Sequence, residues 1–322
     1  MKILVTGGLG FIGSNFILKA LNKHPEYKIT NIDAMLYGSN SNNLKDVHNN
    51  KKYGFVKNNI QNQKVIDKLV SQNEIVINFA AESHVDRSIL NPRSFIDSNI
   101  IGTYTVLEAV RKFKKKLIQI STDEVFGSLM KPISADENFR LNPSSPYSSS
   151  KASAELLVNS YHVTYDLDVI ITRCTNNFGP RQHPEKLIPK VIMLAKENKK
   201  IPVYGTGKNI RDWIFVDDHC DALLDVLHRG NTGESYNISG SNEVTNNFII
   251  RKILKIMNKS TELMSFVKDR PGHDFRYSLD STKIGKKLGW RPKHNFEVGI
   301  EETIEWYLKN QKWWKNISKI NF

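Results

Sequence analysis

The sequence is poor in cysteine, with only Cys174 and Cys220 among its 322 residues. Two widely separated thiols exclude a disulfide framework and offer no metal-type ligand spacing, although a single disulfide between them stays open. Long apolar runs are also missing, because no stretch approaches the ~20 residues that cross a membrane. The residues before Gly7 are too few for the apolar core of a signal peptide. These absences predict a cytoplasmic protein with no membrane partner and no metal site.

The charge is biased toward the positive, with 46 Lys and Arg against 33 Asp and Glu and a formal net charge of +13. Basic chains often bind polyanions. Here, however, the lysines are scattered, and many fall on expected helix faces, as in "RKFKKK" and "KENKK". This pattern favours a phosphate-bearing small substrate or plain surface solvation, and we expect no nucleic acid as a partner.

Apolar strand-like runs alternate with stretches of helical spacing over the first half of the chain. The runs are "KILVTG", "KITNID", "YGFVKN", "EIVINFAA", "KLIQIST" and "DVIITR". Their alternation with helices, expected at 92–113 and 146–165, predicts an α/β fold with a doubly wound parallel sheet. Further helices are expected near 246–258, 281–288 and 296–310, "NNFGPRQHPEKLIP" is expected as a functional loop, and the tail "KWWKNISKINF" is expected to pack onto a lobe.

Four glycines, Gly7, Gly8, Gly10 and Gly13, lie between the first strand-like run and the first helical stretch. They fit both G-x-x-G-x-x-G and G-x-G-x-x-G, patterns in which the chain turns tightly and a dinucleotide pyrophosphate meets a helix N-terminus. Asp33 lies twenty residues beyond Gly13, at the end of the second strand. An acid there accepts hydrogen bonds from the ribose hydroxyls of NAD and repels the extra phosphate of NADP, so the pattern predicts NAD.

Tyr147 and Lys151 are four residues apart at the start of an expected helix, which places both on one helix face. A nearby ammonium stabilises a phenolate, so we expect the pKa of Tyr147 to fall toward neutrality and the residue to act as a base. Thr122 ends the preceding strand, and its hydroxyl can orient a substrate alcohol toward Tyr147. Together with the glycine pattern, these residues predict an enzyme that oxidises or reduces an alcohol carbon.

As a set, these motifs resemble the extended short-chain dehydrogenase/reductases that act on nucleotide sugars, and most closely the nucleoside-diphosphate-glucose 4,6-dehydratases. The resemblance is carried by "TGGLGFIGSN", "NFAAESHVDRSI", "STDEVFG", "SPYSSSKA", "RCTNNFGP", "PEKLIP", "IRDWIFVDDH" and "DRPGHDFRYSLD", from residue 5 to about 280. It implies an NAD-binding Rossmann domain over 1–173, with a return segment at about 211–240. It also implies a smaller nucleotide-sugar-binding lobe over 174–210 and 241–322, and a homodimer paired through the helices near 99–113 and 147–165.

The adjacent acids Asp123 and Glu124 distinguish the dehydratases within this resemblance, since related epimerases carry small residues after the strand-end hydroxyl. Oxidation of the sugar at C4 makes the C5 proton acidic, and Glu124 is assigned as the base that removes it. Asp123, protonated, is assigned as the acid that helps the C6 hydroxyl leave. Two neighbouring carboxyls do not both ionise easily, so their pKa values separate into an acid and a base. Hydride then returns to C6, which yields a 4-keto-6-deoxy sugar of the kind that leads to rhamnose.

The resemblance assigns binding roles residue by residue. The catalytic set is Thr122, Asp123, Glu124, Tyr147 and Lys151. The cofactor-binding set is Gly7, Gly10, Phe11, Ile12, Gly13, Asp33, Asn59, Ile60, Ala80, Ala81, Tyr147 and Lys151. The substrate-binding set is Ser83, His84, Asn176, Lys186, Leu187, Pro202, Tyr204, Arg211, Asn246, Arg270 and His273. Asn59 stands where the family usually has Asp, and Phe178 and Arg181 stand where aromatic hydroxyls are common, so the choice between dTDP-glucose and UDP-glucose stays open.

Two other functions compete with this one. A nucleotide-sugar 4-epimerase would share the cofactor, Tyr147 and Lys151, but would not need Asp123 and Glu124. A catalytically silent NAD-binding or nucleic-acid-binding protein would bind its ligand without turnover. The complete set of five catalytic residues favours the dehydratase over both.

Overall fold

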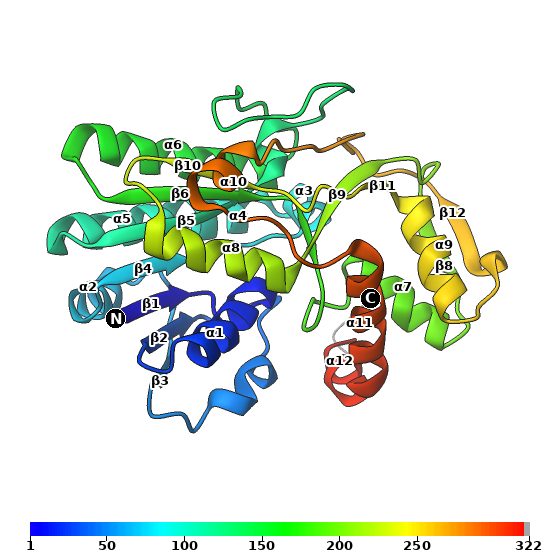
Figure 1. Cartoon of the computed structure of the whole chain (residues 1–322), viewed down its shortest axis with the longest axis horizontal. Helices are drawn as coiled ribbons and strands as arrows, with labels where there is room; N and C mark the ends of the chain where they lie inside the picture. Colours follow the sequence, from blue (N-terminus) through cyan, green and yellow to red (C-terminus); the bar gives the residue numbers. More distant parts are fainter. Residues whose placement is uncertain (319–322) are drawn as a thin grey trace.

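The computed structural model describes residues 1–318, so residues 319–322, the end of the tail and of the expected lobe, lie outside the described part. Its largest element is a seven-stranded sheet in the order β10-β6-β5-β4-β1-β2-β3, in which every pair is parallel (Figure 1). The predicted doubly wound parallel sheet is therefore confirmed. Its strands are β1 (Lys2–Thr6), β2 (Lys28–Asp33), β3 (Tyr53–Lys57), β4 (Ile75–Asn78), β5 (Lys116–Thr122), β6 (Val169–Cys174) and β10 (Ser235–Ile238).

The direction of winding reverses between β1 and β4. Strand β1 pairs with β2 on one side and with β4 on the other, so the chain builds the sheet outward in both directions from this point. In open parallel sheets, the loops at the carboxyl ends of the strands part at such a reversal and leave a crevice for a ligand. The glycine-rich turn, Asp33 and Thr122 all lie at these carboxyl ends.

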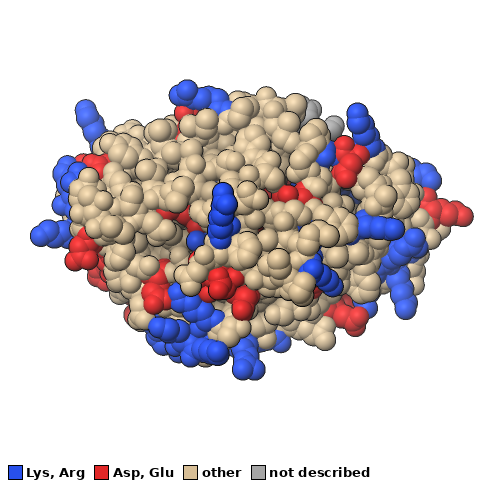
Figure 2. All heavy atoms as spheres, turned by 90° about the horizontal axis from the view of Figure 1, so that it is seen from above, with Lys and Arg blue, Asp and Glu red and all other residues tan. Residues whose placement is uncertain are grey.

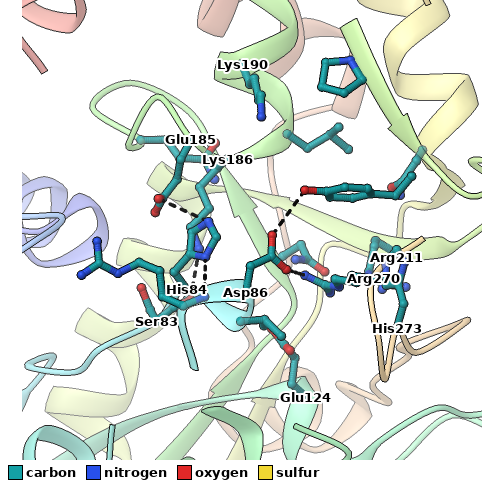
Figure 3. Close-up of a pocket in the computed structure, with 18 of the residues that line it drawn as sticks. Ser83, His84, Asp86, Glu124, Glu185, Lys186, Lys190, Arg211, Arg270 and His273 are labelled. Carbon is teal, nitrogen blue, oxygen red and sulfur yellow. Dashed lines mark hydrogen bonds and ion pairs between the residues drawn. The ribbon is translucent and has the colours of Figure 1, made fainter. Parts of the chain in front are cut away.

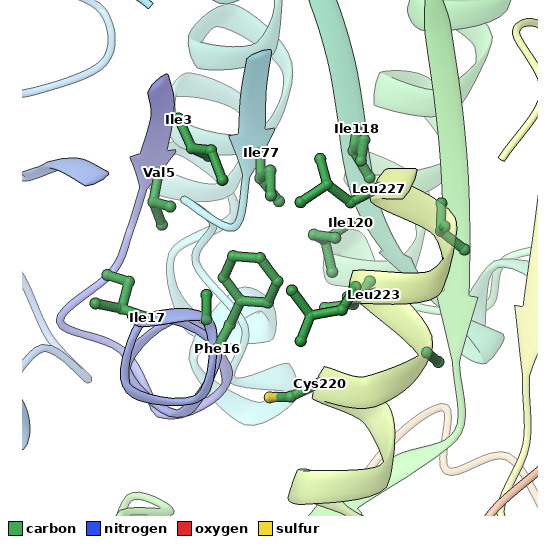
Figure 4. Packing of buried hydrophobic residues seen from close by; sticks show 14 of the residues in the cluster. Ile3, Val5, Phe16, Ile17, Ile77, Ile118, Ile120, Cys220, Leu223 and Leu227 are labelled. Atoms are coloured by element: carbon green, nitrogen blue, oxygen red, sulfur yellow. The ribbon is translucent and has the colours of Figure 1, made fainter. Parts of the chain in front are cut away.

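One face of the sheet is covered by α1 (Phe11–Lys23) and α8 (Val216–Arg229), with η1 (Ser41–Val47) and α10 (Thr282–Leu288) beside them. Alternate strand residues point to this face, as Figure 4 shows for Ile3 and Val5 opposite Phe16 of α1 and Leu223 of α8. Successive strand residues point to opposite faces. Both faces therefore need apolar residues, which explains why the strands read as nearly continuous apolar runs.

The opposite face is covered by α2 (Gln63–Gln72), α5 (Gly102–Phe113) and α6 (Pro146–Tyr165). Here Leu4 and Val76 of the strands pack with Val106 of α5 and Val158 of α6. Helix α6 begins with a capping box, in which the Ser145 side chain and backbone exchange hydrogen bonds with Ser148. This cap fixes where the helix starts, directly before the Tyr147 and Lys151 positions.

The helix expected over 92–113 is not one regular α-helix. It consists of α4 (Pro92–Phe95), the π-helical stretch η2 (Ile96–Ile101) and α5, and it follows α3 (Val85–Leu90). The wider turn contains the buried residue Asn99. Its side-chain oxygen accepts a hydrogen bond from the Glu82 amide, and its side-chain nitrogen donates to the Glu82 carbonyl oxygen and to the Ser150 hydroxyl of α6. The predicted helix is confirmed as one uninterrupted helical run from residue 92 to residue 113. Only its π-helical stretch was not predicted, because tertiary bonds of this kind leave no trace in hydrophobic spacing.

Within residues 1–318, a second, smaller region is built from two short sheets, four α-helices and one short 3₁₀ helix, with Phe178, Trp213, Ile250 and Tyr307 in its core. The sheets are β11-β9-β7 and the parallel pair β12-β8. Strand β7 lies inside the segment expected as a loop, because its backbone pairs with β9. The other expected helices of the last third are confirmed within about two residues at each end. The elements are β7 (Asn176–Phe178), α7 (Leu187–Lys196), β8 (Ile201–Tyr204), β9 (Ile210–Phe215), β11 (Glu243–Thr245), α9 (Asn246–Ile256), η4 (Thr261–Leu263), β12 (Met264–Val267), α11 (Phe296–Lys309) and α12 (Gln311–Ser318).

The aromatic tail packs as expected within its described part. Trp314 of α12 is 3% exposed and donates to the backbone oxygen of Tyr307, and Trp313 donates to the Asn43 side chain near β2. No helix formed by residues 1–318 is long and apolar enough to span a bilayer. Lys and Arg side chains are spread over the face in Figure 2 with Asp and Glu among them, so this face carries no continuous basic stripe.

Candidate active site

Two adjoining cavities open at the carboxyl ends of the large sheet, with volumes of about 310 Å³ and 620 Å³. All twelve residues of the expected cofactor set line the smaller cavity, and all eleven of the expected substrate set line the larger one. Glu124 lines both. The two sets come from segments far apart in the chain, and the fold brings each together around one space.

The glycine-rich turn can pack this closely against neighbouring backbone only because its residues lack side chains. Gly7 has φ +68°, and a Cβ there would lie 2.7 Å from the Ala80 backbone. A Cβ on Gly13 would lie 2.7 Å from the Gly7 carbonyl oxygen. Gly10 precedes α1 and offers no side-chain cap, so the first amides of α1 are not capped by that residue. Such an N-terminus suits a pyrophosphate, and the residues present fit a dinucleotide.

Asp33 lies at the end of β2, buried at one side of the smaller cavity. Its carboxylate accepts hydrogen bonds from the Leu9 and Met35 amides at 3.0 and 2.8 Å and from the Ser39 hydroxyl at 2.8 Å. These bonds fix the loops on both sides of Asp33. The Asn59 side-chain oxygen accepts from the Gln61 amide at 2.9 Å, which leaves one lone pair for a ligand.

The acid pair is positioned by the end of β5. Thr122 caps the short helix η3 (Asp123–Phe126), because its hydroxyl accepts from the Glu124 amide. Gly127 ends that helix with φ +69°, where a Cβ would lie 2.3 Å from the Asn142 carbonyl oxygen. Strand and cap together place Asp123 and Glu124 beside the junction of the two cavities.

The two carboxyls differ in environment. Burial, together with the neighbouring Glu124, raises the pKa of Asp123 well above its usual value. Burial also raises the pKa of Glu124, but the cations of Arg270, Arg211 and Lys186 oppose that rise. The larger upward shift therefore falls on Asp123, which agrees in direction with a protonated Asp123 beside an ionisable Glu124.

Tyr147 and Lys151 lie on the inner face of α6, and both are buried. The prediction that the pKa of Tyr147 lies near neutrality is wrong for this structure: burial raises it well above its usual value, and the charges of Glu124 and Asp123 add to the rise, against a hydrogen bond with Thr122. The Lys151 ammonium instead donates to the Ile120 carbonyl oxygen at 2.6 Å, and burial lowers its pKa to about 8. Sequence spacing alone would put the Lys151 cation beside the Tyr147 phenol and lower its pKa. In the structure, burial and the nearby carboxyls raise that pKa by more.

The larger cavity brings cations together around Arg211 and Arg270 (Figure 3). Arg211 is held in place by the backbone oxygens of Ile210, Asp274 and Phe275, and its guanidinium lies 4.2 Å from the Tyr277 ring centroid. Lys186 donates to the Ser83 backbone oxygen at 3.0 Å. These groups offer several donors to an anion within one space.

The two imidazoles of this cavity are neutral near pH 7. Burial lowers the pKa of His84 to about 4 and also lowers the pKa of His273, whose ring bonds Asp269 at 2.6 Å. His273 therefore brings no charge to the cavity, and its Nδ1–H is donated to Asp269. The positive potential of the cavity comes from its arginines and lysines.

Sequence reasoning missed several residues that organise the site. Asp86 of α3 pairs with Arg270 and accepts from the Tyr204 hydroxyl (Figure 3). Glu185 lines both cavities and bonds Tyr37, whose ring lies under the Arg87 guanidinium. Asp86 and Glu185 lie within two of the sequence motifs quoted above, close to His84 and Lys186. Only the folded chain shows which charged groups face each other.

The fold and the site define an enzyme that binds a dinucleotide beside an acid pair and a cationic substrate cavity. Residues 4–303 match the family model for GDP-mannose 4,6 dehydratase. The chain is 43% identical to dTDP-glucose 4,6-dehydratase of Xanthomonas campestris pv. campestris over 96% of this chain and 94% of that protein. It is also 43% identical to dTDP-glucose 4,6-dehydratase 1 of Escherichia coli over 98% of this chain and 95% of that protein.

Solved structures agree with these relatives. A dTDP-glucose 4,6-dehydratase from Streptomyces venezuelae with NAD bound has a TM-score of 0.97 at 40% identity, covering 99% of this chain and all of that one. A UDP-glucose 4-epimerase from Thermotoga maritima is more distant, with 29% identity and a TM-score of 0.89. That match covers 97% of this chain and all of the epimerase chain. The chain belongs to the nucleotide-sugar 4,6-dehydratase family, which confirms the predicted hydro-lyase with a Rossmann-type fold.

Proposed function

We propose that this chain dehydrates dTDP-glucose to the dTDP-linked 4-keto-6-deoxy sugar with NAD as a cofactor that is not consumed. The observation that carries the proposal is the pair Asp123 and Glu124 at the end of β5, between the dinucleotide cavity and the cationic cavity. An epimerase has no use for such a pair. The relatives named above support thymine as the base, since the most similar of them are called dTDP-glucose dehydratases.

The glycine-rich turn, Asp33 and Lys151 would hold NAD, with the pyrophosphate at the α1 N-terminus and the ribose hydroxyls on Asp33. NAD held there would supply the redox chemistry, as the acceptor of the hydride from C4 of the sugar and later its donor to C6. Thr122 and Tyr147 flank the C4 hydroxyl, and the Tyr147 oxygen receives its proton as C4 becomes a ketone. An oxidised nicotinamide bound there would bring a positive charge, which favours the phenolate that burial disfavours here.

Elimination then falls to the acid pair. Glu124 removes the proton from C5, which the C4 ketone has acidified. Asp123 gives its proton to the C6 hydroxyl, which leaves as water while the C5–C6 double bond forms. The cations around Arg211 and Arg270 bind the diphosphate and keep the glucose at this position.

The experiment incubates purified protein with dTDP-glucose in heavy water and follows the product by mass spectrometry. We expect a product one water lighter that carries one deuterium at C5. UDP-glucose, tested in parallel, is expected to react more slowly. An unchanged mass with loss of the gluco configuration would indicate an epimerase, and binding of NAD with no turnover would indicate a silent binder.

The dimer expected from sequence remains part of the proposal. Large apolar side chains are exposed on η2, α5 and α6, among them Leu156 at 59% and Val163 at 83%. An exposed apolar surface on two neighbouring helices suits the four-helix contact between two copies. Light scattering of the protein and of Leu156→Glu tests this, with a dimer expected for the first and a monomer for the second.

The division of the chain is also proposed, with 1–173 and about 211–240 as the cofactor domain and 174–210 and 241–322 as the substrate lobe. It is supported by β10, which joins the large sheet, by α8, which covers one face of it, and by the separate core around Ile250 and Tyr307. Strand β9 departs from this division, because its Trp213 and Phe215 belong to that second core. Cys174 and Cys220 are buried free thiols, which suits the reducing cytoplasm. Rhamnose is the proposed destination of the product, and no nucleic acid is proposed as a partner.

A further inference from the structure

The two ends of the 620 Å³ cavity differ in chemistry. Glu124 lies at the catalytic end, and Figure 3 shows Lys190 at the opposite end of the view with Asp86 and Arg270 between them. The lining also includes apolar side chains of α7, β8 and α9, namely Leu187, Pro202, Val203 and Ile250. A nucleotide sugar is a linear molecule of glucose, diphosphate, ribose and base. With its glucose at Glu124 and its diphosphate on the arginines, the base is left for this apolar part.

Lys190 is placed here by the geometry of α7. It lies four residues after Lys186 and three after Leu187, and its amide bonds the Lys186 carbonyl oxygen at 2.9 Å, so all three share one helix face. Lys190 is half-buried and lines the cavity, and Figure 3 shows its side chain directed into it. A lysine ammonium beside apolar side chains faces whatever polar edge the base presents.

We propose that Lys190 donates a hydrogen bond to the C4 carbonyl oxygen of a thymine or uracil base and thereby selects these bases against cytosine. An ammonium has three donors and no acceptor. Thymine and uracil carry an acceptor at C4, whereas cytosine carries an amino group there, which is a donor. A base with the wrong group leaves a half-buried charge facing a donor, and hydrogen bonds to charged groups account for about 10- to 100-fold in affinity.

This inference rests on the proposed function and adds the residue that reads the base. It does not separate thymine from uracil, because both carry the same C4 oxygen. It is distinct from diphosphate binding, since a phosphate contact would strengthen every nucleotide equally. The difference between bases is therefore the quantity to measure.

The test measures binding of dTDP, UDP and CDP to NAD-loaded protein by calorimetry, for the unmodified chain and for Lys190→Leu. We expect the unmodified protein to bind dTDP and UDP about 10- to 100-fold tighter than CDP. In Lys190→Leu the first two should weaken by that factor while CDP binding stays the same. Lys196→Leu is the matched control, because Lys196 is exposed on the same helix and the substitution removes the same charge.

Equal weakening of all three nucleotides in Lys190→Leu would overturn the inference in favour of a phosphate or ribose contact. Equal binding of CDP and dTDP by the unmodified protein would overturn it as well, as would no change in the variant. Failure of the proposed function would look different, because the unmodified protein would then not release water from dTDP-glucose. Dehydration that persists without base discrimination at Lys190 rejects this inference alone.

Discussion

The Thr122 hydroxyl donates to Oδ1 of Asp123 across 3.1 Å, and Oδ2 of the same carboxyl is buried with no hydrogen-bond partner among residues 1–318. A buried carboxylate with one oxygen unsatisfied is costly, whereas a protonated carboxyl has a hydrogen to give. Both features favour the protonated form of Asp123. Glu124 faces three cations and is freer to ionise.

The roles of the two acids can be separated by solvent deuterium. Glu124→Gln should still oxidise C4 slowly and accumulate reduced cofactor, visible by its absorbance, but deuterium should not enter C5. Asp123→Asn should slow water loss by about 10²- to 10⁴-fold, because an amide is a very weak acid, while C5 exchange continues. Normal C5 exchange in Glu124→Gln would remove the base role from that residue.

The raised pKa of Asp123 also predicts how stability changes with pH. The folded pKa lies above the unfolded value of about 3.9, so the stability associated with protonated Asp123 is fully present below that value. It is lost as pH rises through the folded pKa. Asp123→Asn does not ionise, so its thermal midpoint relative to the unmodified protein should rise between pH 4 and pH 8.

Differential scanning calorimetry of the protein without added ligand measures this difference. Asp136→Asn is a suitable control, because Asp136 is exposed and caps only the Asn138 amide. A difference that is the same at every pH, or that grows toward acid pH, would contradict a raised pKa at Asp123.

Asp33 should decide the choice of cofactor. Asp33→Asn keeps the shape but removes the negative charge, so NAD binding should weaken by about tenfold while discrimination against NADP falls. Fluorescence titration with both cofactors measures the ratio. Because Asp33 also holds the Leu9 and Met35 amides, the thermal midpoint must be followed in the same samples. An unchanged NAD-to-NADP ratio in a stable variant would show that another group makes the selection.

Arg270 should act mainly on substrate binding. Arg270→Lys loses the planar fork that holds phosphate oxygens by two bonds, so KM should rise about tenfold with little change in kcat. Arg291→Lys, an exposed arginine outside both cavities, is the matched control. A fall in kcat with KM unchanged would place Arg270 in the chemical step.

The parts of the site whose residues lie close together in the sequence were predictable from the sequence. The glycine turn, the acid pair and the Tyr147–Lys151 spacing each depend on neighbours a few residues away, and all line the expected cavities. The π-helical turn at Ile96–Ile101 and the Asp86–Arg270 pair were not predictable in this way. They depend on partners that only the folded chain brings close.

The sequence by itself determined the parallel sheet, the order of its chemical groups and the family, because strand-end motifs and apolar periodicity are local properties of the chain. The tertiary structure decided the state of those groups. It buried Tyr147 beside carboxyls and raised its pKa, turned the Lys151 ammonium to a backbone oxygen, and set Lys190 at the far end of the substrate cavity. Burial and the distances between charges govern these properties, and both arise only when distant segments meet.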